Sequence, residues 1–374
     1  MQKKIIVLAL AAAFAAPAFA DTTVYGVVDA VAANISASGT KSDLSVHTGG
    51  LAGSRLGVKS SEDLTGGLKA SVVLEYSLDV VNAAGTTAAG TSATGGATTA
   101  VSNGSAIGTA RQQYASLGGD FGTVAAGYLQ TTGYDFSRFD PTSGSLISPL
   151  HNITKTVFLV GNNASLKRLP RALGYTSPDM GGVTVGVNYS TGADGTTNLG
   201  VANNSTADKA TAYLVSANYA AGPLGVALVY ANKTAAVAAA ATTAAVKTTE
   251  TAIGASYDLG MAKLFATYQT NKVDGATDAN SVMSVSASAP FAASTVVLTY
   301  AKATMTAAGT DKDASGYTVA YLNSLSKTTT FYAAYSAMSQ GSASAGYSVA
   351  NDAVSGLANG TGSSMVAAGL NKKF

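Results

Sequence analysis

The chain has 374 residues, of which 11% are charged, and it contains 41 glycines but no cysteine and no tryptophan. Its 22 Lys and Arg residues nearly balance 20 Asp and Glu residues. The chain therefore lacks the excess of positive charge that would indicate nucleic-acid binding. The lack of cysteine excludes thiol chemistry and disulfides, so an exported chain of this composition needs another source of stability.

The first 20 residues have the three parts of a signal peptide. Two lysines open the chain, residues 5–16 form an apolar run too short to span a bilayer, and Ala18–Ala20 provides a small-residue cleavage motif. We therefore expect a leader at 1–20 and a mature domain at 21–374. The leader has two lysines and no acid, so the mature chain has 20 basic residues, 20 acidic residues and no net charge.

The segment Ser54–Asp79 shows the clearest strand pattern and is predicted to form two β-strands joined by a polar turn. Every other residue from Leu68 to Leu78 is apolar, whereas Lys69 and Glu75 lie among the residues between them. A soluble sandwich would turn the apolar face toward a core, whereas a membrane barrel turns it toward lipid and lines its lumen with the polar face. The alternation fits both, and the rest of the chain distinguishes them.

After residue 20 the chain alternates between segments of about 10 residues, the length of a tilted membrane strand, and polar separators of two kinds. Seven separators are short: 60–66, 118–122, 177–182, 220–223, 259–261, 289–292 and 323–327. Eight are longer: 36–51, 80–109, 130–166, 193–207, 234–247, 273–278, 304–312 and 339–362. Short connections on one side and long ones on the other are typical of outer-membrane barrels. We therefore predict an all-β fold, a sixteen-stranded antiparallel transmembrane β-barrel.

No catalytic or metal-binding pattern is visible in the sequence. His47 and His151 are the only histidines, both lie in expected loops, and neither has a partner at metal-ligand spacing. The chain has no phosphate-binding glycine loop between a strand and a helix, and no G-x-S-x-G motif. We therefore expect neither an enzyme nor a bound cofactor.

Five motifs in chain order carry a resemblance to a known family. They are Thr23–Asp29; Ser54–Gly57 with Ser61–Leu64 and Gly66–Ala70; Arg111–Leu117 with Gly119–Val124; Tyr175–Pro178 with Gly181–Gly182; and the terminal Phe374. Together they resemble the general diffusion porins of Gram-negative bacteria, in the neisserial and β-proteobacterial branch. The resemblance covers essentially the whole chain and is densest over 21–190.

The resemblance implies a homotrimer in the outer membrane, among lipid and lipopolysaccharide, that acts as a passive channel for ions and small hydrophilic solutes. It also implies that the barrel-assembly machinery reads Phe374 and that the third long loop, 130–166, folds inward to narrow the pore. In the family this constriction lies between basic wall residues and the acids or carbonyls of the loop. The matching wall positions here are Arg55, Arg111 and Arg168.

The alternation supports the first two wall positions unevenly. Arg55 alternates with apolar Leu56 and Val58, so it should face the lumen, because a charge facing lipid costs about 2–4 kcal/mol near the midplane. Arg111 shares the parity of apolar Leu117. It points inward only if a bulge intervenes or if the outward face of its strand is the less apolar one. For each arginine the alternative is a charge at a rim in bulk water.

The third wall position depends on a proline. Arg168 lies opposite apolar Leu169, but Pro170 would remove a hydrogen bond from the predicted sixth strand. We expect Pro170 to mark the start of that strand, which brings Arg168 nearer the loop and leaves Arg171 as the alternative. Tyr128 stands where the family often has arginine.

Charges of both signs are candidates for the constriction. The positive ones are Arg55, Lys59, Lys69, Arg111 and Arg168, and the negative ones are Glu75, Asp135 and Asp140. Opposite charges across a narrow, water-filled gap order polar solutes, and the excess sign sets the ion preference. If the arginines outnumber the acids at the narrowest point, a mild preference for anions follows.

Two other functions are compatible with the sequence. A barrel with a plugged lumen would be a surface adhesin or a structural protein, and its long loops at 80–109 and 339–362 would then carry the function. A substrate-specific channel usually carries a row of aromatic residues, and the absence of tryptophan disfavours one.

Overall fold

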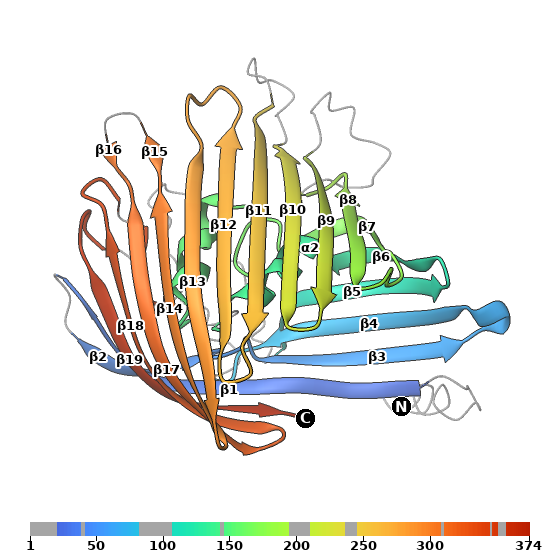
Figure 1. Cartoon of the computed structure of the whole chain (residues 1–374), viewed down its shortest axis with the longest axis horizontal. Coiled ribbons are helices and arrows are strands. Elements are labelled where there is room, and N and C mark those ends of the chain that lie inside the picture. The colour runs from blue at the N-terminus through green and yellow to red at the C-terminus, as the bar shows by residue number, and fades with distance from the viewer. Residues whose placement is uncertain are drawn as a thin grey trace, which may run out of the picture.

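The computed structural model of the chain describes residues 21–38, 42–81, 107–142, 146–193, 210–235, 245–307, 310–344, 346–350 and 357–374. One antiparallel sheet of seventeen strands dominates it. The sheet closes on itself because β1 (Asp21–Ala37) pairs with β19 (Ser363–Lys373). Figure 1 shows these strands side by side, with the connection β12–β13 at the upper end and short turns at the lower end. The predicted leader and most of the expected loop 80–109 lie outside the described residues.

The other strands of the sheet follow in chain order: β2 (Asp43–Thr48), β3 (Arg55–Asp63), β4 (Lys69–Leu78), β5 (Ile107–Gly119), β6 (Gly122–Gln130), β7 (Arg168–Thr176), β8 (Val183–Ser190), β9 (Thr211–Ala221), β10 (Leu224–Thr234), β11 (Lys247–Asp258), β12 (Lys263–Val273), β13 (Asn280–Phe291), β14 (Ser294–Thr304), β17 (Ala314–Ser326) and β18 (Thr329–Gln340). A separate two-stranded ladder, β15 (Thr306–Ala307) and β16 (Thr310–Asp311), lies between β14 and β17. A 3-10 turn, η1 (Thr65–Gly67), joins β3 to β4.

The second strand of the barrel is interrupted. β2 pairs with residues 30–35 of β1 and β3 pairs with residues 21–27, so both continue one path along β1. Counted in this way, the seventeen strands form sixteen barrel strands, which confirms the predicted number. The prediction of a loop at 36–51 is wrong over residues 43–48, which form β2. Leu44 and Val46 alternate there with more polar neighbours and extend the hairpin of β1.

A buried carboxylate holds the break between β2 and β3 against the wall. Asp29, in β1, accepts hydrogen bonds from the backbone N–H groups of Gly50–Ala52 at 2.9–3.1 Å. It also accepts from the Tyr332 hydroxyl of β18 at 2.6 Å and from the Asn371 amide of β19 at 2.7 Å. Because burying a carboxylate without donors is costly, these five bonds account for its presence at the seam between the first and last strands.

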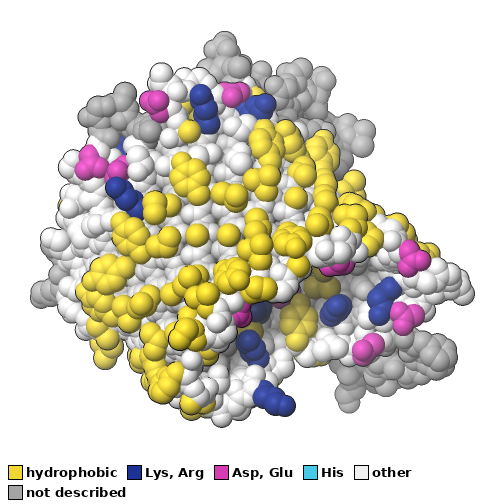
Figure 2. Space-filling view, viewed as in Figure 1, with side chains coloured by type: hydrophobic (Ala, Val, Ile, Leu, Met, Phe, Trp, Pro, Cys, Tyr) yellow, Lys and Arg dark blue, Asp and Glu magenta, His cyan; other side chains and the backbone are white. Residues whose placement is uncertain are grey.

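The two faces of the wall differ as a membrane barrel requires. Along β10, Leu228 and Tyr230 are exposed, whereas Ala227 and Val229 are buried. A soluble protein would bury such large apolar side chains, whereas a barrel in a bilayer presents them to lipid. Figure 2 shows a broad band of hydrophobic side chains across the visible outer surface. The apolar face predicted from the alternation is therefore the outward one.

The connection between β6 and β7, residues 131–167, is the longest stretch of described chain outside the strands. It contains α2 (Thr132–Asp135), the 3-10 turn η2 (Phe136–Phe139) and α3 (Pro149–Val157). Ser148 caps α3 by accepting the N–H of His151, and proline occupies the first helical position. The helices were not predicted. None of the described helices has the length and apolarity needed to cross a bilayer.

This connection contacts inward-facing side chains on the far wall. Glu250 of β11 accepts the backbone N–H groups of Leu159 and Val160 at 2.5 and 3.3 Å. Thr318 of β17 donates to the carbonyl of Ile147 at 2.5 Å. At Gly254 of β11 an added Cβ would lie 2.5 Å from the ring of Phe139, so only glycine fits.

Candidate functional site

Four side chains from four strands meet on the inner face near β4. Arg111 Nε lies 2.7 Å from Glu75 Oε1, and Arg55 Nε lies 3.8 Å from Oε2. The Tyr25 hydroxyl donates to Oε2 at 3.1 Å. The Glu75 side chain is only 6% exposed, so its charge depends on these partners. The structure brings together three residues expected from the sequence and adds Tyr25, which was not expected.

The register of the sheet explains how Tyr25 reaches this carboxylate. Tyr25 pairs with Gly57 across β1 and β3, and Gly57 pairs with Glu75 across β3 and β4. A Cβ at Gly57 would collide with the ring of Tyr25. The missing side chain therefore lets the ring cross an entire strand and donate to the next one.

An irregularity in β5 sets the direction of Arg111. Glu75 lies opposite Gln112, but Tyr76 lies opposite Ala110, so Arg111 is an extra residue in the ladder between β4 and β5. A bulge of this kind redirects the side chain that it contains. This is the bulge on which an inward direction of Arg111 depended.

Arg168 contributes a third guanidinium group at the start of β7. Its Cζ lies 4.9 Å from the ring centroid of Tyr134 in α2, a cation–π distance. It is also close enough to Arg111 for the two charges to repel each other. Its Nε and Nη2 are buried and make no hydrogen bond within the described structure. These donors are the unused hydrogen-bonding capacity of the cluster.

The proline of β7 does not mark the start of its strand, contrary to expectation. β7 begins two residues earlier, at Arg168, and the ladder with β6 changes register where Pro170 and Arg171 lie opposite Tyr128. Arg171 has a left-handed φ of 50°. This irregularity accommodates the missing N–H of Pro170. Arg168, not Arg171, is the arginine that lies over Tyr134.

The two loop acids occupy different environments. Asp135 ends α2, is accessible from the lumen and accepts a hydrogen bond from Gln130 at 2.8 Å. Desolvation deep inside the barrel raises its pKa, against this hydrogen bond and the charge of Arg138, which lower it. Asp140 is 5% exposed and accepts hydrogen bonds from Thr142 and Ser148 within the loop. Burial raises the pKa of Asp140 as well. Asp140 was expected to line the constriction. Instead, its hydrogen bonds within the loop stabilise the loop.

The two lysines expected at the constriction lie apart from the arginines. Lys69 forms an ion pair with Asp63 at 3.1 Å beside the β3–β4 turn, where both side chains are largely exposed. Lys59 is exposed on β3, four residues beyond Arg55 in the direction of the same turn. Ion pairs as exposed as that of Lys69 contribute little to stability. The structure thus places both lysines toward the short-turn end.

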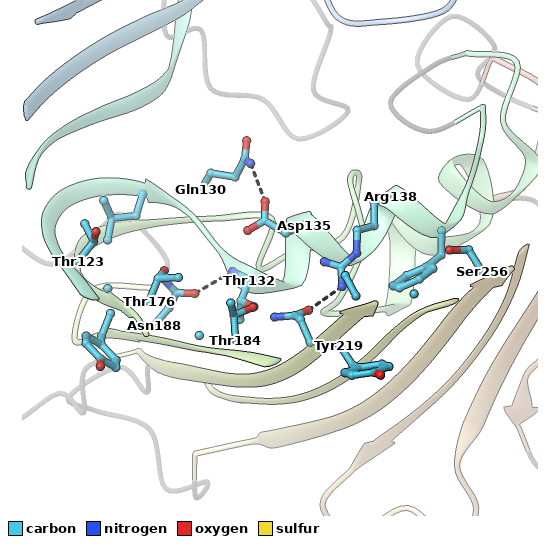
Figure 3. A pocket seen from close by; sticks show the side chains of 18 of the residues that line it. Thr123, Gln130, Thr132, Asp135, Arg138, Thr176, Thr184, Asn188, Tyr219 and Ser256 are labelled. Atoms are coloured by element: carbon cyan, nitrogen blue, oxygen red, sulfur yellow. Dashed lines mark hydrogen bonds between the residues drawn. The ribbon is translucent and has the colours of Figure 1, made fainter. Parts of the chain in front are cut away.

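A cavity of about 800 Å³ lies beside α2 and the inner faces of β5–β12. Figure 3 shows Gln130, Asp135, Thr132 and Arg138 turned toward it, with Asn188 on the opposite strand. Arg138 donates to the Asn218 side chain at 2.8 Å and lies 4.6 Å from the ring of Phe139. The lining therefore mixes amides and hydroxyls with the charged side chains of Asp135, Arg138, Asp258 and Lys263, which suits water and polar solutes.

The histidines lie in separate elements. His47 is in β2, not in a loop as expected, and its Nε2 lies 2.7 Å from the Ser45 hydroxyl. His151 is in α3. Within the described ranges no three His, Cys, Asp or Glu side chains are grouped as a metal site would require.

Comparison with known proteins identifies the family. Residues 7–345 match the family described as Gram-negative porin. The chain belongs to this family. Over 196 residues this porin is 32% identical to outer membrane porin protein 32 of Delftia acidovorans, which covers 51% of the chain and 50% of that protein. The match therefore spans about half the length of that curated relative. A Gram-negative porin with this fold is located in the outer membrane.

Solved structures share the architecture of this porin. It aligns with an anion-selective porin from Comamonas acidovorans with a TM-score of 0.73 and 26% identity, covering 95% of this chain and 100% of that one. It aligns with the trimer form of OmpT from Vibrio cholerae with a TM-score of 0.62 and 14% identity, covering 95% and 99%. At that identity the second likeness concerns the fold alone.

Three residues of the porin's site escaped the sequence analysis. Tyr25 belongs to the motif Thr23–Asp29, but nothing in that motif indicates a contact with Glu75, and Tyr134 lies in no motif. The roles of both tyrosines arise only from contacts with Glu75 and Arg168. Arg138 could have been suspected because it is a charged residue between two phenylalanines in the predicted loop. Contacts between residues 34 or more positions apart, as these are, leave no local signal in one sequence.

Proposed function

We propose that the protein is a general porin, a water-filled channel through which ions and small hydrophilic solutes diffuse passively, with a mild preference for anions. One observation carries the preference: three guanidinium groups, from Arg55, Arg111 and Arg168, surround a single carboxylate, Glu75. The cluster therefore has an excess of positive charge. The name of the Comamonas acidovorans structure, an anion-selective porin, supports the same sign.

We further propose that the connection 131–167 narrows the pore. Its hydrogen bonds to Glu250 and Thr318 hold it against inward-facing side chains of the wall opposite the arginines. Tyr134, in its first helix, faces Arg168. A passing solute would then move between the loop and the arginines of β3, β5 and β7.

The geometry suggests how the channel favours anions without chemical turnover. An anion that enters the gap is attracted by the net positive charge of the three guanidinium groups around Glu75. Glu75 neutralises part of the positive charge, so the attraction stays weak enough for the ion to leave. Such a channel holds no reaction intermediate and requires no cofactor, so we propose that the protein is not an enzyme.

Planar-bilayer recording of the purified protein tests this function. A porin gives stepwise conductance, and under a KCl gradient an anion-preferring channel has a reversal potential of the sign set by chloride. The absence of conductance steps would favour the plugged barrel of an adhesin or structural protein. A reversal potential of the sign set by potassium would refute the anion preference.

The expected partners are also proposals. We infer a homotrimer from family membership, and contact with outer-membrane lipid and lipopolysaccharide from the outward apolar face. Phe374 exchanges backbone hydrogen bonds with Gly26 and leaves its side chain 56% exposed, which suits an aromatic end read by the barrel-assembly machinery. Gel electrophoresis of unheated and boiled samples tests the trimer, since a single band at the monomer position in both would contradict it.

A further inference from the structure

Two arginines approach Glu75 to different distances. Arg111 Nε lies 2.7 Å from Oε1, at the distance of a charge-assisted hydrogen bond. Arg55 Nε lies 3.8 Å from Oε2, too far for an N–H···O bond, and its Nη1 donates instead to the carbonyl of Gly53 at 2.9 Å. The Arg55 side chain is 27% exposed, against 16% for Arg111. Arg55 therefore keeps more of its charge open to the lumen.

A neutral donor occupies the carboxylate oxygen that faces Arg55. The Tyr25 hydroxyl donates to Oε2 of Glu75 at 3.1 Å. Because Glu75 is almost fully buried, a carboxylate oxygen without a hydrogen-bond donor would be costly. Tyr25 supplies that donor at Oε2 without adding a charge. The two oxygens of Glu75 thus have different partners, a guanidinium at Oε1 and a phenol at Oε2.

The sheet has a gap that admits this phenol. Gly57 lies between Tyr25 and Glu75 in the register, and an added Cβ there would lie 2.6 Å from the Tyr25 hydroxyl oxygen. A glycine inside a strand weakens the strand and often marks a place where another group approaches closely. The contact between Tyr25 and Glu75 therefore depends on the residue type at position 57 as well as on the two partners.

We propose that Tyr25 is a positioning residue that sets the strength of the anion preference. By occupying Oε2 it holds Arg55 away from the carboxylate, so Glu75 neutralises Arg111 closely and leaves much of the field of Arg55 in the pore. Without the hydroxyl, Arg55 Nε needs to move by only about 1 Å to donate to Oε2. The tighter ion pair draws Arg55 away from the lumen. This inference rests on the proposed anion preference and identifies a residue that tunes it.

Reversal potentials of Tyr25→Phe in planar bilayers under a KCl gradient test this role. The ratio of anion to cation permeability should fall about twofold, because one guanidinium charge is partly neutralised but not removed. An unchanged ratio would overturn the proposal. A higher ratio would also overturn it, because the carboxylate would then have taken up a proton instead of capturing Arg55.

Tyr76→Phe is the matched control for the loss of a tyrosine hydroxyl. Tyr76 follows Glu75 on β4, alternates in phase with the exposed Leu74, and accepts a hydrogen bond from the Gln113 amide at 2.7 Å. This variant loses a hydroxyl contact of similar length on the outward face, so it should keep the wild-type ratio. A fall as large as that of Tyr25→Phe would overturn the proposal.

Coupling to Arg55 separates positioning from a general structural effect. In the Arg55→Gln background, Tyr25→Phe should cause no further fall, because the guanidinium that it positions is gone. A fall as large as in the wild-type background would overturn the proposal. Gly57→Ala keeps the hydroxyl but obstructs the ring, so it should lower the ratio in the same direction, and it replaces Tyr25→Phe if that variant does not fold. An unchanged ratio in Gly57→Ala would likewise overturn the proposal.

The wild-type recording separates a failure of this inference from a failure of the proposed function. A wild type that does not conduct, or that prefers cations, refutes the proposed function and this inference with it. A wild type that prefers anions, combined with an unchanged ratio in Tyr25→Phe, overturns only the role of Tyr25.

Discussion

At the scale of single residues, the positive charge of the cluster depends on which arginines face the lumen. Arg111 and Arg55 share Glu75, whereas Arg168 has an aromatic ring as its neighbour and two unused donors. Arg168 is therefore the guanidinium of the cluster whose charge no ion pair with Glu75 neutralises directly. Arg171, three positions away, is held in a left-handed conformation within the irregular part of β7.

Replacing Arg168 should weaken the anion preference. Arg168→Gln removes one of three guanidinium charges, so the ratio of anion to cation permeability should fall by on the order of two- to fivefold, as expected for a partly screened unit charge. Arg171→Gln is the matched control and should leave the ratio unchanged. Reversal potentials in a salt gradient measure both. An effect of Arg171→Gln as large as that of Arg168→Gln would show that the wrong arginine has been assigned.

The raised pKa of Asp135 predicts a pH response in mild acid. Above that pKa the carboxylate is charged and attracts cations, and as the pH falls through it the group loses its charge earlier than an ordinary Asp. The anion preference should therefore increase between about pH 7 and about pH 4.5, a range that lies above the ordinary Asp pKa of about 3.9. Asp135→Asn should show the stronger preference at both pH values. A pH response of equal size in this variant would exclude Asp135 as its source.

At the scale of secondary-structure elements, the segment 131–167 depends on a few polar contacts for its position. The carboxylate of Glu250 accepts two of its backbone N–H groups and one hydrogen bond from Asn271. Phe136 and Phe139 of the same segment pack against Gly254, four residues farther along β11. Polar and apolar contacts thus attach the middle of the segment to the same strand.

Removing the acceptor should release this attachment. Glu250→Ala leaves two buried N–H groups without a partner, at a cost of about 1–3 kcal/mol for each unsatisfied group. We expect larger and noisier single-channel conductance, because the segment can move away from the wall. Thr251→Ala, on the outward face of the same strand, should conduct as the wild type does. Identical traces for Glu250→Ala and the wild type would mean that this contact does not position the segment.

At the scale of the whole molecule, the seam between the first and last strands is held by more than the backbone ladder. Asp29 connects β1, β18, β19 and the break after β2 through five hydrogen bonds. Asp29→Ala should lower the temperature at which the barrel unfolds, because several buried donors lose their acceptor at about 1–3 kcal/mol for each unsatisfied group. The band shift between unheated and heated gel samples measures this. Asp21→Asn, an exposed change in the same strand, should have no effect, and an equal shift would refute the role of Asp29.

The barrel was predictable because its sequence pattern is local. Period-two alternation and the contrast between short and long connections led to sixteen strands, and the predicted bounds of 130–166 lie within one residue of the observed connection. The interrupted second strand was missed because Asp29 holds residues 50–52 through contacts that no local pattern encodes. Asp140 was placed wrongly for the same reason, since its partners Thr142 and Ser148 use it inside the loop.

The most direct test of the anion preference compares the reversal potential of the wild type with that of R55Q/R111Q/R168Q under the same KCl gradient. The wild type should have a potential of the sign set by chloride, and the variant, which keeps Glu75, should shift toward the sign set by potassium. A wild type that prefers potassium, or a variant as anion-preferring as the wild type, would contradict the proposed role of the arginine cluster.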